Sequence, residues 1–149
     1  MIDNPKTGMT LIVKTITRLT VGLILLFGIY IILHGHLSPG GGFAGGVIVA
    51  LSFVHLMLAF GEDVAVSKVS KNMASHLESI GALMFLGVAL LGFIGGSFFL
   101  NVLSKGRPFN LLSSGTIILS NISIGIKVGV GLLAIFLALV ILESAGKEQ

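Results

Sequence analysis

Cysteine is absent from this 149-residue chain, and charged residues are scarce. Without cysteine, disulfide bonds, iron–sulfur clusters and thiolate metal sites are excluded. Charged residues make up only 10% of the chain, whereas soluble domains carry about 25%. Such a surface could not be kept in water, so we expect an integral membrane protein. The net charge of +3 is small and lies in the chain ends and loops, which fits membrane topology signals and not a nucleic-acid partner.

The few charged residues divide the chain into membrane spans. After Arg18, no Lys, Arg, Asp or Glu appears before Glu62. This leaves room for two spans of about 20 residues joined by a tight connection. We therefore predict an all-α integral membrane protein with one domain, residues 1–149, and a glycine-rich turn between its first two helices. The four predicted transmembrane helices cover residues 11–33, 45–60, 79–103 and 120–142.

Lysine and arginine predict which side of the membrane each loop faces. With four spans, the N-terminus, the middle loop and the C-terminus share one side. That side carries six of these residues, namely Lys6, Lys14, Arg18, Lys68, Lys71 and Lys147, and the opposite side carries Lys105 and Arg107. Because cytoplasmic loops are enriched in Lys and Arg, we expect a multi-pass protein of the cell membrane with both termini in the cytoplasm.

Glycines spaced four residues apart indicate where helices approach closely. The pairs are Gly41 with Gly45, Gly42 with Gly46, Gly92 with Gly96, and Gly125 with Gly129. On a helix, each pair puts two hydrogens in place of side chains on one face, so another backbone can come near. The pattern fits packing inside the chain as well as it fits oligomerisation, and both interpretations stay open.

The stretch HGHLSPGGG, residues 34–42, is polar but has no charged residue. A second helix of 45–60 would be about 24 Å long, less than a hydrocarbon core of about 30 Å. The turn is therefore predicted to make up the difference by dipping into the membrane, where protein or a water-filled cavity must cover its amides. Pro39 fixes φ, and Gly40, Gly41 and Gly42 allow conformations closed to other residues. The turn could present backbone groups to an ion or to a partner helix.

His34 and His36 are candidate ligands or proton carriers in this turn. The stretch lacks the lysine and hydroxyl that follow a phosphate-binding loop, so a nucleotide cofactor is not expected. Two histidines without a nearby acid or thiol are too few for zinc, so we predict no metal site. Histidine has a suitable pKa for passing protons, which makes the two residues ion-path candidates. The alternative is that they are interfacial polar residues at the end of the first helix.

Lys127 is the main ion-path candidate because it lies in an otherwise apolar helix. An ammonium there costs about 2.5–3.5 kcal/mol on insertion scales, and such residues usually face a bundle interior or a cavity. The alternative is snorkelling, in which the stem lies along the helix and the ammonium reaches the headgroups. No acidic residue of the chain is predicted at the depth of Lys127, so we expect any carboxylate partner to come from another subunit.

Ionisable residues also occur in or beside the second and third predicted helices. Glu78 precedes the predicted third helix, where it would complement the helix dipole; alternatively, Glu78 and His76 form a polar entry for cations or protons. His55 is expected to hydrogen-bond to a neighbouring helix, with a proton relay as the alternative. No Ser/His/Asp set or pair of carboxylates has a catalytic arrangement, so we expect neither an enzyme nor a cofactor.

Three segments of the chain resemble one known family. They are HGHLSPGGGFAGGVIVA, ESIGAL at the start of the third helix and SNISIGIKVGVGL at the start of the fourth. The first is similar to the His-Gly-His-x-x-Pro-Gly-Gly-Gly-Phe-x-x-Gly run of the MnhB family, a membrane component of Mrp-type multisubunit Na+/H+ antiporters. The resemblance covers nearly the whole chain. It includes Gly45 and Gly46 among the motif residues, and a lysine at the place of Lys127 looks like part of the family pattern.

The resemblance implies a membrane subunit of a cation/proton antiporter that contributes to the sodium path or to its scaffold. Its partners would be other membrane subunits and lipid, with Na+ and H+ as the transported ions. Two alternatives remain open. Related subunits occur in archaeal membrane-bound hydrogenase and sulfane reductase complexes, so the same module could serve a redox-driven ion pump. The chain could also be a purely structural subunit that seals a partner against lipid.

Overall fold

The computed structural model is built of helices. It describes residues 9–61, 71–103, 106, 109–110 and 113–147, without the side chains of 71–72 and 143–147. The elements are α1 (Leu11–His34), α2 (Gly41–Phe60), α4 (Lys71–Leu91), the 3₁₀ helix η1 (Gly92–Gly95) and α5 (Thr116–Lys147). No strand occurs in the described residues.

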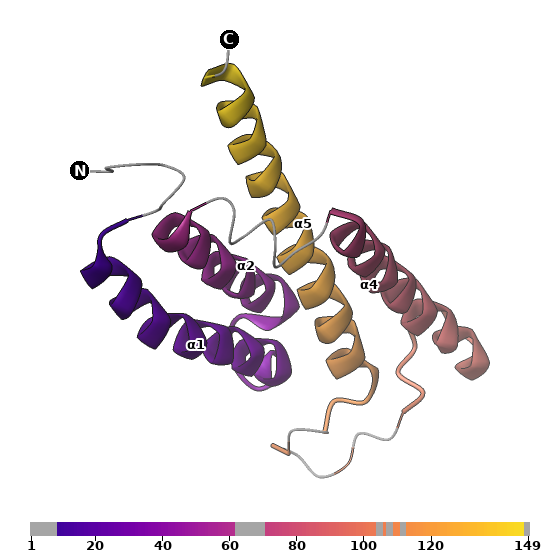
Figure 1. The fold of residues 1–149 in the computed structure, drawn as a ribbon. Helices are drawn as coiled ribbons and strands as arrows, with labels where there is room; N and C mark the ends of the chain where they lie inside the picture. Colours follow the sequence, from indigo (N-terminus) through magenta and orange to yellow (C-terminus); the bar gives the residue numbers. More distant parts are fainter. Residues whose placement is uncertain (1–8, 62–70, 104–105, 107–108, 111–112, 148–149) are drawn as a thin grey trace.

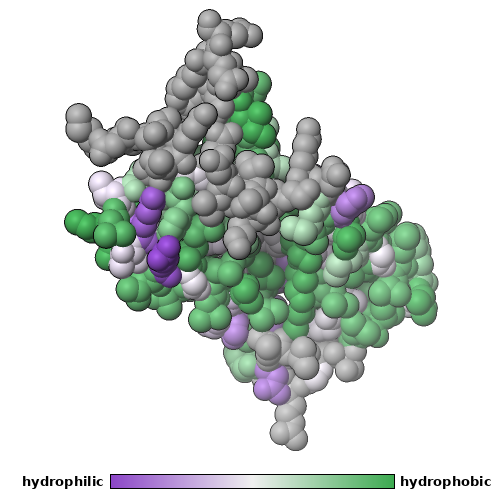
Figure 2. All heavy atoms as spheres, viewed as in Figure 1, coloured by the Kyte–Doolittle hydropathy of each residue, from purple (hydrophilic) through white to green (hydrophobic). Residues whose placement is uncertain are grey.

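Four segments are long and apolar enough to cross a membrane. They are Leu11–His34, Gly41–Phe60, Met73–Gly95 and Thr116–Leu142. Hydrophobic side chains make up most of the coloured surface in Figure 2, with only small hydrophilic patches between them. A surface of this kind suits a bilayer or apolar partner helices and not water. The predicted all-α fold with four transmembrane helices is confirmed.

The helices pack in the order α1, α2, α5, α4, so that α5 lies between α2 and α4 (Figure 1). Near their beginnings, Gly42 of α2 lies against Asn121 of α5, and near their ends Met57 packs with Leu137. These contacts show that α2 and α5 run in the same direction. The neighbours α1 and α2 run in opposite directions, because Gly28 meets Gly45.

Glycines bring α2 close to the helices on both sides. A Cβ on Gly46 would lie 2.8 Å from the carbonyl oxygen of Gly125, and one on Gly45 would lie 2.8 Å from the carbonyl oxygen of Gly28. Real Cβ atoms do not come this near to backbone, so only glycine permits these crossings. The Gly42 with Gly46 pair and the Gly125 with Gly129 pair therefore serve packing inside the chain.

The buried apolar core is small for a chain of this length. Its main cluster consists of Met57, Leu133 and Leu137, with Phe53, Val54, Phe136 and Val140 packed around it, and most of the other buried apolar residues of the described chain are alanines. Many large apolar side chains are exposed, including Leu11 at 79% and Leu142 at 68%. The four helices thus form an open arrangement and leave wide apolar faces for lipid or for other subunits.

The second helix begins four residues earlier than predicted. It starts at Gly41, and its 20 residues span about 30 Å, which matches a hydrocarbon core. The expectation of a helix too short to cross the membrane is therefore wrong. Gly40 at φ 139° and Gly41 at φ 79° let the chain turn sharply into the helix, so that two of the three glycines belong to it.

The third span differs from its prediction, 79–103, at both ends. Helix α4 already begins at Lys71, and the helical part ends with η1 at Gly95. The chain reverses at Gly96, with φ 98°, and the N–H of Phe99 donates to the carbonyl oxygen of Ala89 at 3.2 Å. This fold-back, residues 96–103, is as free of charged residues as residues 79–95 before it, so charge placement alone could not separate the two.

The fourth helix begins at Thr116 instead of residue 120 and continues to Lys147. Asn101 explains its start. The side-chain Oδ1 of Asn101 accepts a hydrogen bond from the N–H of Thr116 at 3.1 Å, and its Nδ2 donates to the carbonyl oxygen of Ser114 at 2.9 Å. An amide from the fold-back after α4 thus satisfies one of the free backbone donors at the beginning of α5. The first helix, Leu11–His34, agrees with its prediction to within one residue.

Candidate functional site

Lys127 lies well inside the membrane-spanning part of α5. It follows Thr116 by eleven residues, which is about 16 Å along the helix axis. The predicted helix begins four residues later and places Lys127 closer to the membrane edge. At the observed depth, snorkelling towards the start of α5 becomes less favourable, because the stem of a lysine is much shorter than this distance.

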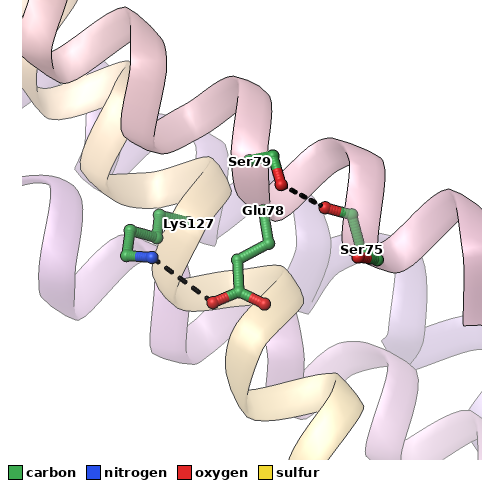
Figure 3. A network of polar contacts seen from close by, with 4 residues as sticks. All are labelled: Ser75, Glu78, Ser79 and Lys127. Atoms are coloured by element: carbon green, nitrogen blue, oxygen red, sulfur yellow. Dashed lines mark hydrogen bonds and ion pairs between the residues drawn. The ribbon is translucent and has the colours of Figure 1, made fainter.

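A carboxylate of the same chain meets Lys127. The Nζ of Lys127 lies 3.3 Å from Oε1 of Glu78, and the two side chains point toward each other from α5 and α4 (Figure 3). Glu78 is seven residues into α4, beyond the first turn, so it does not complement the helix dipole as expected from the sequence. The expectation that any carboxylate partner must come from another subunit is also wrong, because Glu78 is such a partner.

A glycine of α4 makes room for this ion pair between α4 and α5. A Cβ on Gly81 would lie 3.0 Å from the backbone nitrogen of Lys127 and 3.1 Å from the carbonyl oxygen of Ser123. Ser123 is fully buried, and its hydroxyl donates to the carbonyl oxygen of Leu119 at 2.7 Å. Gly81 therefore allows the two helix backbones to come close where the ion pair forms.

The ion pair remains half exposed. The side chains of Lys127 and Glu78 are 50% and 44% exposed, respectively. Lys127 has three N–H donors, and Glu78 is the partner that the structure gives one of them. Exposing such groups to lipid is costly, and charged residues in membrane helices usually face a bundle interior or a water-filled cavity. This face of α4 and α5 is thus suited to contact another protein surface or water.

His76 and the neighbouring serines do not join the ion pair. His76 is exposed, and residues two apart on a helix lie on different faces, so it does not meet Glu78. The hydroxyl of Ser79 donates to the carbonyl oxygen of Ser75 at 2.9 Å, within its own helix (Figure 3). The entry predicted from Glu78 and His76 is therefore not brought together among the described residues.

The two histidines of the turn have separate surroundings. The Nδ1 of His34 lies 3.1 Å from the carbonyl oxygen of Tyr30, and its ring stacks on that of Tyr30 with centroids 4.0 Å apart. The Nε2 of His36 instead reaches the carbonyl oxygen of Asn110 at 3.2 Å, before α5. His34 thus ends α1, while His36 joins the turn to the segment that precedes α5. Neither ring contacts Lys127.

Asn121 is a site residue that the sequence reasoning did not single out. Its Oδ1 accepts a hydrogen bond from the N–H of Gly42 at 3.3 Å, at the start of α2. Its Nδ2 is buried and has no hydrogen-bond partner within the described part of the chain. The signal was present in the sequence, since Asn121, Gly125 and Gly129 repeat every four residues on one face of the fourth helix. Pro39 is exposed and lies in the turn before α2.

Comparison with known proteins identifies the family. Residues 12–134 match the MnhB domain, described as a domain related to the MnhB subunit of Na+/H+ antiporter. The chain belongs to the MnhB family. It is 32% identical over 148 residues to the B subunit of the Na(+)/H(+) antiporter of Bacillus subtilis, covering 93% of this chain and 94% of the relative. It is also 34% identical over 104 residues to a putative antiporter subunit mnhB2 of Staphylococcus epidermidis, covering 68% and 71% of the two chains.

Two further matches are to longer chains. An uncharacterised protein of Methanocaldococcus jannaschii is 35% identical over 117 residues, which cover 74% of this chain but only 44% of that protein. A chain in the structure of the membrane-bound sulfane sulfur reductase, an archaeal respiratory membrane complex, superimposes with a TM-score of 0.74 at 31% identity. That match covers 92% of this chain and 60% of the other. The chain therefore spans less than two thirds of both of these relatives.

Membership of the MnhB family confirms the resemblance noted in the sequence. The chain is an MnhB-type antiporter subunit, a transporter component and not an enzyme, and it is a multi-pass membrane protein. The structural neighbour is itself part of a membrane complex, which agrees with a subunit that works in a multisubunit assembly.

Proposed function

We propose that this chain is a subunit of a complex that exchanges Na+ for H+ across the cell membrane, with Glu78 and Lys127 on its ion path. The observation that carries the proposal is the half-exposed ion pair between two membrane-spanning helices. The names of the B. subtilis and S. epidermidis relatives supply the ions and the type of transport. Other subunits are required, because one ion pair is too short a series of titratable groups to carry a proton across the membrane.

The chemistry of the pair suits exchange of one cation for another. One positive charge compensates the negative charge of the Glu78 carboxylate, and Lys127 supplies it when it is protonated. When Lys127 gives up its proton, a sodium ion can take the place of that charge, since carboxylate oxygens are good ligands for hard cations. A proton released and a sodium ion bound then leave the net charge of the site unchanged. In this scheme His34 and His36 belong to the outer end of the subunit, on the same end as the start of α5.

The orientation is part of the proposal. Both termini lie in the cytoplasm, because six of eight assigned Lys and Arg residues fall on that side of the predicted topology. The turn between α1 and α2 then faces the outside. The exposed face around Glu78 and Lys127 meets another membrane subunit, which shields the ion pair from lipid.

Transport by the assembled complex tests this function. The complete set of subunits is expressed in cells that lack their own antiporters, with and without this chain, and everted vesicles are energised to form a pH gradient. Addition of Na+ should collapse the gradient only when this chain is present. An unchanged sodium response without the chain, in a complex that still assembles, would show that it has no part in exchange.

A second candidate is the same module within a redox-driven ion pump. It is favoured by the superposition on a chain of the sulfane sulfur reductase complex. Purification of the native assembly separates the two functions. Co-purifying nickel–iron or iron–sulfur subunits indicate the redox-driven complex, whereas antiporter-type subunits alone indicate a stand-alone exchanger. A purely structural, lipid-sealing subunit would instead tolerate polar substitutions at both Lys127 and His34 without change in transport.

A further inference from the structure

His55 is an ionisable residue that the proposed site does not use. It lies in the membrane-spanning helix α2, and its Nε2 is 3.3 Å from Oγ1 of Thr20 on α1. The expectation from the sequence that His55 hydrogen-bonds to a neighbouring helix is therefore confirmed. An ionisable side chain at this place in a membrane helix calls for a functional explanation.

The surroundings of Thr20 suggest which nitrogen of His55 carries the proton. The Thr20 hydroxyl lies 3.0 Å from the carbonyl oxygen of Ile16, which can only accept, so we assign its single hydrogen to that contact. With this assignment, the Oγ1 of Thr20 accepts from Nε2–H of His55. In the neutral ring this leaves a lone pair on Nδ1, for which the described residues supply no hydrogen-bond donor.

A second threonine of α1 lies one helical turn from Thr20. Thr17 is three residues before Thr20 on α1, so the two hydroxyls share the face that meets α2. Thr17 is fully buried, and its hydroxyl has no hydrogen-bond partner among the described residues. Helices normally bury such groups only with partners. Thr17, Thr20 and His55 therefore add two hydroxyls and an imidazole to the packing of α1 and α2.

The charged groups around this contact lie apart from His55. Arg18 and Lys14 of α1 approach the ring of Phe60, at 5.2 and 6.0 Å from its centroid, five residues beyond His55 at the end of α2. Neither α1 nor α2 contains an Asp or Glu. On α5, which packs on the other side of α2, Lys127 pairs with Glu78 of α4. The described part of the chain thus provides no carboxylate that would hold His55 permanently charged.

We propose that His55 is a second proton-binding site of the subunit, separate from the Glu78–Lys127 pair. The proton enters and leaves at Nδ1, while Nε2 keeps its own proton and continues to donate to Thr20. The proton is exchanged with water or with an acidic group of an adjoining subunit. His55 pairs with α1 on one side of α2, whereas Lys127 of α5, on the other side of α2, pairs with α4. In this proposal a proton on His55 therefore follows a route distinct from the one at Lys127.

The substitution His55→Gln separates proton binding from the hydrogen bond. The Gln amide can still donate to Thr20, but unlike an imidazole it does not take up a proton near neutral pH. In the complete complex, His55→Gln should assemble as the wild type does and exchange ions at least about tenfold more slowly. Wild-type exchange by His55→Gln between about pH 5 and pH 8, the range in which an ordinary histidine changes its charge, would overturn the proposal and leave His55 as a packing residue.

A second variant and a second measurement keep the test decisive. Thr20→Val retains His55 but removes the oxygen that holds the Nε2 proton, so it should displace the pH profile of exchange. An unchanged profile would also contradict the proposal. The inference depends on the complex moving protons, as proposed above. If the wild-type complex shows no exchange, the proposed antiporter function fails independently of His55. An infrared pH titration then still decides whether His55 binds a proton, from the imidazole bands that are present in the wild type and absent in His55→Gln.

Discussion

Asn121 of α5 accepts a hydrogen bond from the backbone N–H of Gly42 at the beginning of α2. A Cβ on Gly42 would collide with the carbonyl oxygen of Asn121 and would lie 2.9 Å from Cβ of Ile124. The glycine-rich motif that this chain shares with the MnhB family is thus in direct contact with the fourth helix. The same contact explains why two of the three glycines belong to a helix and not to a free loop.

The substitution Gly42→Val should destabilise the subunit because α2 and α5 could no longer approach at this point. Overpacking of a close contact costs about 1–3 kcal/mol, so less of the complex should survive purification and its thermal transition should fall. Gly41→Val should act in the same direction, since Gly41 has φ 79° and lies against Asn121. The control is Gly87→Ala in α4, where an added Cβ meets nothing within 4 Å. If Gly42→Val is as stable as Gly87→Ala, the close packing of α2 on α5 is incorrect.

The cap that Asn101 forms on α5 should also contribute to stability. Asn101→Ala removes the acceptor for Thr116 N–H and the donor to Ser114, and loss of such a cap costs about 1–2 kcal/mol. Asn101→Asp keeps an oxygen for Thr116 but loses the donor to Ser114, so its effect should be smaller. Thermal unfolding of the purified subunit in detergent measures both. Equal losses for the two variants would show that Thr116 gains nothing from the Oδ1 contact.

The number and type of helices could be predicted from the sequence, because each span forms an apolar run that charged residues interrupt. The helix ends could not be predicted equally well. The fold-back after Gly95 is as apolar as α4, so its membrane-like composition extended the predicted third helix too far. The predicted start of α2 is too late because runs of glycine are typical of turns, whereas Gly41 and Gly42 are helical and packed against α5.

The ion-path candidates depended on those helix ends. Lys127 could be predicted because a cation in an apolar helix is conspicuous. Its partner could not, because α4 begins at Lys71, eight residues before the predicted start, which brings Glu78 inside the helix. The hydrogen bond between Thr20 and His55 joins residues that are 35 positions apart. Only the antiparallel packing of α1 on α2 brings them together, and the sequence does not specify which residues face each other across that contact.

The predicted topology can be tested by labelling, because the chain has no cysteine of its own. Single cysteines placed at Asn4 and at Lys147 should be protected from a membrane-impermeant thiol reagent in whole cells. A cysteine at Arg107 should react, since that loop is predicted to face outside. Permeabilised cells provide the control, in which all three positions should be labelled. The reverse pattern in whole cells would place both termini outside.

The ion pair between Lys127 and Glu78 provides the most direct test of the proposed transport site. Lys127→Ala should leave the complex assembled, because neither side chain is fully buried. Sodium-dependent proton exchange should nevertheless fall, by about 100-fold if Lys127 itself passes protons. Lys127→Arg keeps the positive charge but does not release a proton, because arginine stays protonated in proteins. It should therefore retain part of the activity only if a fixed charge beside Glu78 is what transport requires.

Glu78→Gln tests the other half of the pair. It removes the negative charge that a proton or a sodium ion would compensate, so exchange should fall as it does in Lys127→Ala. If the two residues act as one unit, the double substitution should be no slower than either single one. Ser79→Ala is the matched control, because the Ser79 hydroxyl bonds only within α4. Normal exchange by Lys127→Ala across a range of pH would mean that the lysine has a structural role and that the ion path lies in other subunits.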